Sequence, residues 1–354
     1  MSVAMKTVPG YSSSKPGIQV GTKLIPRDGV FRERDFTFLR QLGVEWVMVE
    51  GPPGEKSDVQ VYKEIVKRVT AEGFKVYRIA NPYYHNMDVI TLNLDGRDKR
   101  LEGYLDYIRA LGEAGVHYST YAHMANGIWR SGKTKTIRGG VAGGGLDMDD
   151  ANKKGKWGGV VWRGDKLSHG RIYTEEELWV NYEYFITRAA RVAEAAGVFI
   201  GIHPDDPPVY TLGGIPRALF GTFEGYKRAL EIADSKHIGV CLCCGCWLQG
   251  GEKMGADVYG AIRYFASMNK LFKLHVRNVT NPLYEKGGFA ETYPNDGYGD
   301  VLKIVDTLGE MGFDGCIIND HLAHMVGGAR VSEAYQTAYL EGVTDAVNRK
   351  YAAE

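Results

Sequence analysis

The sequence predicts a (β/α)8 barrel formed by one domain over residues 1–354, a length that suits one barrel with insertions. Eight short apolar runs alternate with eight amphipathic stretches, which is typical of parallel strands covered by helices. In addition, potential metal ligands stand at the ends of four consecutive apolar runs. The C-terminal ends of barrel strands converge on one cavity, so these four side chains are expected to meet.

The elements follow from hydrophobic periodicity and from helix-end signals. The expected strands are 17–22, 44–50, 74–80, 117–123, 198–203, 238–244, 271–277 and 315–320. The expected helices are 31–42, 57–72, 99–114, 174–196, 221–235, 255–268, 299–312 and 330–348. Thr174 and Glu177 match a capping box, and Gly197 can end the same helix with positive φ.

The composition excludes several classes of protein. Lys and Arg total 43, as do Asp and Glu, so nothing indicates a nucleic-acid or acidic-membrane partner. The first residues lack the apolar stretch of a secretion signal, and no 18-residue apolar run exists. The five cysteines are too crowded for a disulfide framework, with four of them in 241–246. We therefore expect a cytoplasmic protein with free thiols.

Residues 125–172 interrupt the alternation after the fourth expected strand. The segment is rich in glycine and holds Trp157 and Trp162. Long loops in compact domains are usually functional, and this one follows a strand end, so we expect it on the active-site face as a lid. The alternative is a structural excursion or a contact between subunits.

Residues 127–134 match the phosphate-binding pattern GxxxxGK[ST]. A working loop of this kind needs a helix to begin at the lysine, because helix N-terminal N–H groups hold the phosphate. The following glycine-rich residues cannot begin a good helix, and Trp129 and Arg130 are too bulky for the loop. We therefore reject nucleotide binding.

Two of the candidate metal ligands lie in short motifs with other reactive side chains. His203 opens HPDDPP, whose prolines stiffen the turn, and Asp205 and Asp206 are weaker ligand candidates that could instead cap a helix or face solvent. The thiol ligand could be Cys241 or Cys243, which share one strand face. A thiolate selects a softer divalent ion than Mg²⁺.

The last two expected strand ends add His275 and Asp320 as candidate ligands. Arg277 lies two residues after His275, where it can bind a carboxylate or hydroxylated substrate, or close the barrel end with a salt bridge. His321 follows Asp320 and is free to transfer protons, with His324 as a weaker candidate.

These motifs, GIHPDDPP with a later GGIPR, then GVCLCCG, HVRNV and NDH, together with AHMANGIWRSG, resemble the mannonate dehydratase family of xylose-isomerase-like TIM barrels. The resemblance runs through most of the chain and is strongest in 198–321. It implies a divalent metal, most often Mn²⁺, held by His203, Cys243, His275 and Asp320, with His321 in proton transfer. Mg²⁺, Fe²⁺, Co²⁺ or Zn²⁺ are alternatives.

The resemblance further implies a hydro-lyase that converts D-mannonate into 2-keto-3-deoxy-D-gluconate and water. Its partner would be a small sugar acid or sugar, and by analogy with such barrels we expect a dimer or tetramer. The chain departs from the family at the last strand, where RPDHG is replaced by residues 318–322, and Gly328 stands where a catalytic tyrosine is expected. Tyr335 is nearby but is expected inside the last helix. The loop after HVRN also lacks the family's histidine.

These departures leave two alternatives. One is a metal-dependent sugar isomerase, epimerase or carbohydrate lyase of the same superfamily. The other is an inactive barrel that binds sugar.

Overall fold

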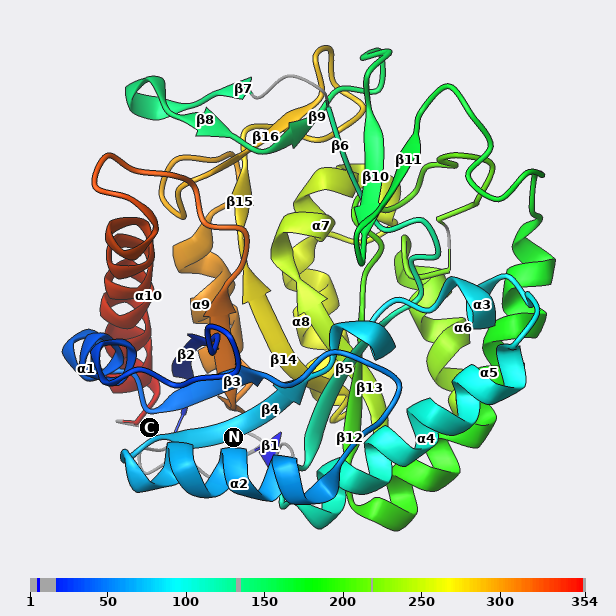
Figure 1. The fold of residues 1–354 in the computed structure, drawn as a ribbon. Coiled ribbons are helices and arrows are strands. Elements are labelled where there is room, and N and C mark those ends of the chain that lie inside the picture. The colour runs from blue at the N-terminus through cyan, green and yellow to red at the C-terminus, as the bar shows by residue number, and fades with distance from the viewer. Residues whose placement is uncertain (1–4, 7–16, 132–134, 218, 353–354) are drawn as a thin grey trace.

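The computed structural model describes residues 5–6, 17–131, 135–217 and 219–352, and its centre is an eight-stranded parallel sheet that curves into a nearly closed barrel (Figure 1). The strands are β2 (Gln19–Leu24), β3 (Trp46–Glu50), β4 (Lys75–Ala80), β5 (Tyr118–Ala122), β12 (Phe199–His203), β13 (Ile238–Cys243), β14 (Leu271–Val276) and β18 (Cys316–Asn319). The order in the sheet is β4-β3-β2-β18-β14-β13-β12-β5. These eight strands match the eight expected from the apolar runs.

The gap between the edge strands β4 and β5 is bridged near their C-terminal ends. The backbone N–H of Ala122 donates to the carbonyl of His85 at 3.0 Å. Nη2 of Arg78 donates to the carbonyl of Thr120 at 3.3 Å. The barrel therefore closes through residues that also face its C-terminal mouth.

Eight long helices lie outside the strands, where their apolar faces pack on the sheet (Figure 1). They are α1 (Glu33–Leu42), α2 (Val59–Ala71), α4 (Arg97–Glu113), α5 (Glu175–Ala196), α6 (Phe223–Ala233), α8 (Val258–Ser267), α9 (Val301–Glu310) and α10 (Ala329–Ala352). The capping box of Thr174 and Glu177 begins α5, and Gly197 ends it with φ 65°. Among the described residues, none of the helices has the length and apolar content needed to cross a bilayer.

Short elements gather beyond the barrel mouth, at the top of Figure 1. In the segment 125–172 they are β6 (Ile128–Arg130), β7 (Lys135–Thr136), β8 (Ala142–Gly143), β9 (Gly145–Leu146), β10 (Lys154–Trp157) and β11 (Val160–Arg163). After β14 come β15 (Asn278–Val279) and β16 (Phe289–Thr292), and β16 pairs with β9. The remaining elements are β1 (Met5–Lys6), β17 (Phe313–Asp314), α3 (Asp88–Thr91), α7 (Cys244–Gly250), η1 (Pro82–Tyr84), η2 (Arg138–Gly140) and η3 (Gly251–Met254).

The structure shifts several expected boundaries by a few residues, as for the last helix, which extends to Ala352, and it divides one expected strand between two elements. The strand predicted over 238–244 ends at Cys243, and helix α7 begins at Cys244. Residues 132–134, which complete the GxxxxGK[ST] pattern, lie outside the described residues. The residues that follow them form strand β7 rather than the helix that phosphate binding requires.

Candidate active site

The four candidate metal ligands meet at the C-terminal mouth of the barrel. His203, Cys243, His275 and Asp320 are buried, and one ligand atom from each lies within 4.8 Å of the others. His203 and Cys243 are the last residues of β12 and β13, and strand register places Cys243 beside His275. Parallel strands in register thus bring together side chains that are far apart in the sequence.

The two imidazoles present nitrogen atoms suited to a metal. Nδ1 of His203 lies 2.7 Å from the carbonyl oxygen of Pro204, which only accepts, so Nδ1 carries the proton and Nε2 is left as a ligand atom. Nδ1 of His275 is buried with no hydrogen-bond partner among the described residues and lies 3.8 Å from Oδ2 of Asp320. A buried nitrogen without a partner beside a carboxylate fits a divalent cation.

The thiol of Cys243 completes this group. Burial alone would raise its pKa, but a hydrogen bond from Cys246 and the guanidinium of Arg277 bring the pKa of Cys243 well below its usual value. Its Sγ lies 3.7 Å from Oδ2 of Asp320. Cys241 lies outside the group, and burial raises its pKa. Two imidazoles, a thiolate and a carboxylate are donors that divalent transition metals prefer.

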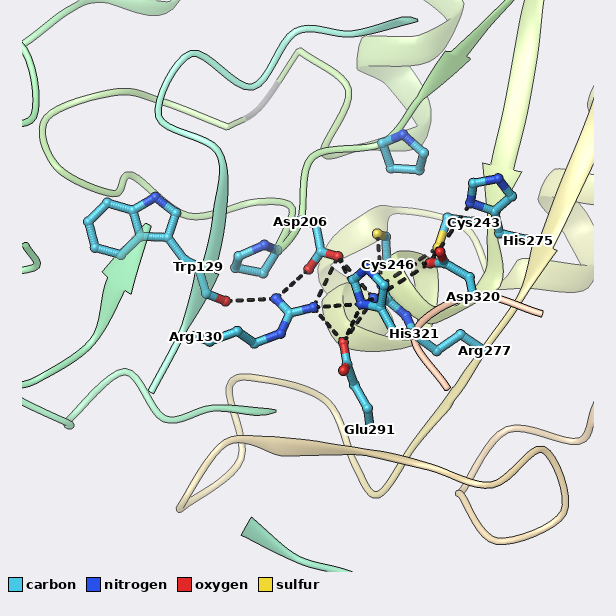
Figure 2. Close-up of polar contacts among 12 residues, drawn as sticks. Trp129, Arg130, Asp206, Cys243, Cys246, His275, Arg277, Glu291, Asp320 and His321 are labelled. Atoms are coloured by element: carbon cyan, nitrogen blue, oxygen red, sulfur yellow. Dashed lines mark hydrogen bonds and ion pairs between the residues drawn. The ribbon is translucent and has the colours of Figure 1, made fainter. Parts of the chain in front are cut away.

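A second group lies beside the first and consists of Asp206, Glu291 and His321 (Figure 2). Nη1 of Arg277 lies 2.9 Å from Oδ2 of Asp206 and 2.9 Å from Oε1 of Glu291. Arg130 contacts both carboxylates as well, with Nη1 2.9 Å from Oδ1 of Asp206. Two guanidinium groups already compensate the two carboxylates, so this group is an ion-pair network rather than a second cation site.

The arginines set the charge of these carboxylates. Burial would raise the pKa of Asp206, but Arg130 and Arg277 lower it well below its usual value. Burial likewise opposes ionisation of Glu291, yet Arg130, His321 and Arg277 lower its pKa to about 2. Asp205 is buried nearby but joins neither group of ligand atoms.

His321 links the two groups. Its Nδ1 lies 2.7 Å from Oε1 of Glu291, and its Nε2 lies 3.9 Å from Oδ2 of Asp320. Nη2 of Arg130, at 3.0 Å, and Nη1 of Arg277 also contact Nδ1, so Glu291 and the two arginines surround this nitrogen and Nε2 is left for proton transfer. Burial lowers the pKa of His321, but Asp320 and Glu291 outweigh this effect and raise it. The backbone of His321 has φ 49°, a left-handed conformation that turns the chain out of β18.

A cavity of about 200 Å³ opens onto both groups. His203, Asp206, His275, Asp320 and His321 contribute to its wall. Lys23 and Arg78 add positive charge to the wall, and Asn81 and His85 add neutral polar groups. The apolar part of the wall consists of Met48, Ala80, Pro82, Met124, Ile128, Trp157 and Ile318. Ile128 and Trp157 belong to the segment 125–172, which therefore covers part of the cavity. A mixed polar and aromatic wall suits a small hydroxylated molecule.

The other candidate residues lie elsewhere. Arg277 is fully buried behind the cavity wall, in the ion-pair network. His324 is exposed. Tyr335 lies inside α10, and its hydroxyl contacts Asn295 and Arg138. Among the described residues that line the cavity, none is a tyrosine.

Sequence reasoning missed Arg130, Glu291, Arg78 and Trp157 as site residues. Arg130 and Trp157 lie in the irregular segment after β5, and Glu291 lies in the loop after β14. Arg78 sits inside an apolar strand, KVYRIA, and a charged residue within such a run was the available signal.

Comparison with known proteins identifies relatives of the chain. Residues 164–354 match the family model described as D-mannonate dehydratase (UxuA). The chain is 29% identical to mannonate dehydratase 1 of Bacillus licheniformis over 336 residues, covering 87% of this chain and 89% of that protein. It is 28% identical to mannonate dehydratase of Thermotoga neapolitana, with 87% and 91% covered.

Solved structures show the same fold. Mannonate dehydratase from Streptococcus suis superposes with a TM-score of 0.80 at 24% identity, covering 96% of this chain and 95% of that one. An L-ribulose 3-epimerase superposes with a TM-score of 0.60 at 16% identity, covering 95% and 97%. The architecture is thus that of the xylose-isomerase-like barrels, as expected from the sequence.

Proposed function

Because the chain belongs to the D-mannonate dehydratase family, we propose that it removes water from D-mannonate to give 2-keto-3-deoxy-D-gluconate. The observation that carries the proposal is the placement of His321 beside four converging metal-ligand side chains on one cavity. Such a site joins charge stabilisation to proton transfer, and dehydration next to a carboxylate needs both.

The residues proposed to hold the metal are His203, Cys243, His275 and Asp320, and the proposed ion is Mn²⁺. When bound, a divalent ion supplies Lewis acidity that stabilises negative charge developing near the substrate carboxylate. Neighbouring residues set the tautomer and the ionisation state of two of these side chains. Pro204 holds the tautomer of His203, and Cys246 and Arg277 favour the thiolate of Cys243.

His321 is the proposed proton-transfer residue. Glu291, Arg130 and Arg277 all contact its Nδ1, so Nε2 is the nitrogen that can exchange a proton with the substrate. In the reaction the C2 proton leaves carbon, the C3 hydroxyl takes up a proton and departs as water, and the resulting enol becomes the 2-keto group. Arg277 and Arg130 are proposed to position His321, both by direct contact and through Glu291, rather than to touch the substrate.

The test is to incubate the Mg²⁺-loaded protein with D-mannonate in D₂O and follow the reaction by NMR. We expect signals of the 2-keto-3-deoxy product. The variant His321→Gln should lower kcat by about 10²- to 10⁴-fold. It should still bind metal as the wild type does, which elemental analysis would show. An unchanged kcat in this variant would remove His321 from the proposed mechanism.

One observation favours a second candidate function, that of a sugar isomerase or epimerase. The described residues that line the cavity include no tyrosine, and Gly328 occupies the position where the family resemblance leads us to expect one. The same NMR experiment, repeated with neutral sugars, separates the two functions. Deuterium entering a neutral sugar without loss of water, together with no product from D-mannonate, would identify the isomerase or epimerase and exclude the dehydratase.

A further inference from the structure

Arg78 is a buried cation on the wall of the cavity. It lies in β4, its exposed fraction is 7%, and its contacts are all to neutral groups. Nη1 lies 3.7 Å from Sδ of Met48, and Nη2 lies 3.3 Å from the carbonyl oxygen of Thr120 and 3.5 Å from Nδ1 of His85. Its Nε is buried with no hydrogen-bond partner in the part of the chain that the structure describes.

Three other cations at the mouth of the barrel, Arg130, Arg277 and Lys23, differ from Arg78 in having anionic partners. Arg130 and Arg277 each contact Asp206 and Glu291. Lys23 lies 3.8 Å from Oδ1 of Asp320 and is 40% exposed, so water also solvates it. No described carboxylate lies within the 4.0 Å ion-pair distance of Arg78.

A buried charge without a counter-charge is costly, because the lost hydration is not replaced. A guanidinium offers paired N–H donors that match the two oxygens of a carboxylate. We propose that Arg78 binds the carboxylate of the substrate and thereby makes the cavity selective for sugar acids over neutral sugars. This inference rests on the proposed function, and it names the residue that recognises the acid group.

The surroundings of Arg78 suit the hydroxyl groups that accompany such a carboxylate. Nδ1 of His85 lies 3.1 Å from the carbonyl of Thr120 and donates to it, so Nε2 is available to accept from a hydroxyl. The ring of His85 lies 5.2 Å from that of Trp157, and both line the same cavity. Arg78, a hydrogen-bond acceptor and an aromatic face thus come together on the cavity wall, where the ring of His85 lies 6.3 Å from that of the proposed ligand His203.

The experiment compares two ligands that differ only at C1. Titration calorimetry of the metal-loaded protein would measure binding of D-gluconate and of D-glucitol, its neutral polyol counterpart. In the wild type the acid should bind more tightly. In Arg78→Met that preference should fall by about tenfold to a hundredfold, with D-glucitol binding unchanged. Arg78→Lys keeps the positive charge but lacks the paired N–H donors, so it should retain part of the preference for the acid.

Lys23→Met is the matched control, because it removes a cavity cation that already has a carboxylate partner. It should change the acid preference less than Arg78→Met does. KM and kcat for D-mannonate separate recognition from chemistry, and KM should rise more than kcat falls in Arg78→Met. If Arg78→Met does not fold, the preference for the acid is compared between the wild type and the variants Arg78→Lys and Arg78→Gln.

The outcomes distinguish this inference from the proposed function. If the wild type dehydrates D-mannonate but the arginine variants keep the full preference for the acid, the role of Arg78 is overturned and the function stands. If the wild type does not dehydrate D-mannonate but its preference for the acid depends on Arg78, the carboxylate site stands and the function does not. A wild type that binds both ligands equally also overturns the inference.

Discussion

Nη1 of Arg277 lies 2.9 Å from Oδ2 of Asp206, and the two side chains are 0% and 1% exposed. Asp206→Asn would remove one charge of this buried pair and leave Arg277 and Arg130 with less compensation. We expect the free energy of unfolding to fall by about 3 kcal/mol, because an uncompensated buried charge is costly. Urea denaturation of the metal-loaded protein measures it.

The neighbouring Asp205 provides the control for this prediction. It is buried but has no ion pair within 4.0 Å in the described chain. Asp205→Asn should therefore cost about 1 kcal/mol or less. Equal losses in the two variants would show that burial of the segment, and not the pairing with arginine, determines the cost.

The choice between the two thiols on β13 leads to a second prediction. Cys243→Ser removes a proposed ligand and should abolish tight metal binding, because a serine hydroxyl is a poor substitute for a thiolate. Cys241→Ser changes a thiol on the same strand face that lies 3.6 Å from Nε2 of His275 but outside the ligand group. Elemental analysis after gel filtration should find metal in Cys241→Ser and little in Cys243→Ser. The reverse pattern would show that Cys241, and not Cys243, is the thiol ligand.

The sequence was sufficient to predict the barrel and the convergence of four candidate ligand side chains, because each of them ends an apolar run and parallel strands place such ends together. It was not sufficient for the ion-pair network. Arg130 and Glu291 come from β6 and β16, short strands in irregular segments whose position is set by tertiary contacts such as the pairing of β16 with β9. Helix α7 was missed for a similar reason. Cys244 follows a buried strand without a break in hydrophobicity, so periodicity alone cannot show where the strand ends.

Gly245 in α7 gives a third prediction. A Cβ atom added there would lie 2.0 Å from Nε of Arg277, which is fully buried and cannot move away freely. Gly245→Ala should therefore lower stability by about 1–3 kcal/mol and displace Arg277 from Glu291. Gly342→Ala is the matched control, since this exposed helical position in α10 has nothing within 4 Å of an added Cβ. That variant should gain about 0.5–1 kcal/mol. A gain in both variants would mean that the helix adapts without disturbing Arg277.

His123 is expected to make the protein sensitive to mild acid. It is buried against the rings of Tyr121, Tyr182 and Phe220, and burial lowers its pKa from about 6.5 to about 3. The unfolded chain therefore binds a proton near pH 6.5 that the folded protein does not. Stability from this residue is complete above pH 6.5 and falls by about 1.4 kcal/mol per pH unit below it, until the folded pKa is reached.

The comparison that isolates this effect is between the wild type and His123→Gln, whose amide does not titrate. All other titrating groups are common to both proteins, so they cancel in the difference between the two free energies of unfolding. The pH dependence of this difference therefore reports on His123, whatever the substitution costs at pH 7.5. Denaturation at pH 7.5, 6.0 and 5.0 should show the wild type losing about 1.4 kcal/mol more per unit below pH 6.5 than the variant. Parallel curves would mean that His123 becomes protonated in the folded protein, with water or a rearranged Tyr121 compensating the charge.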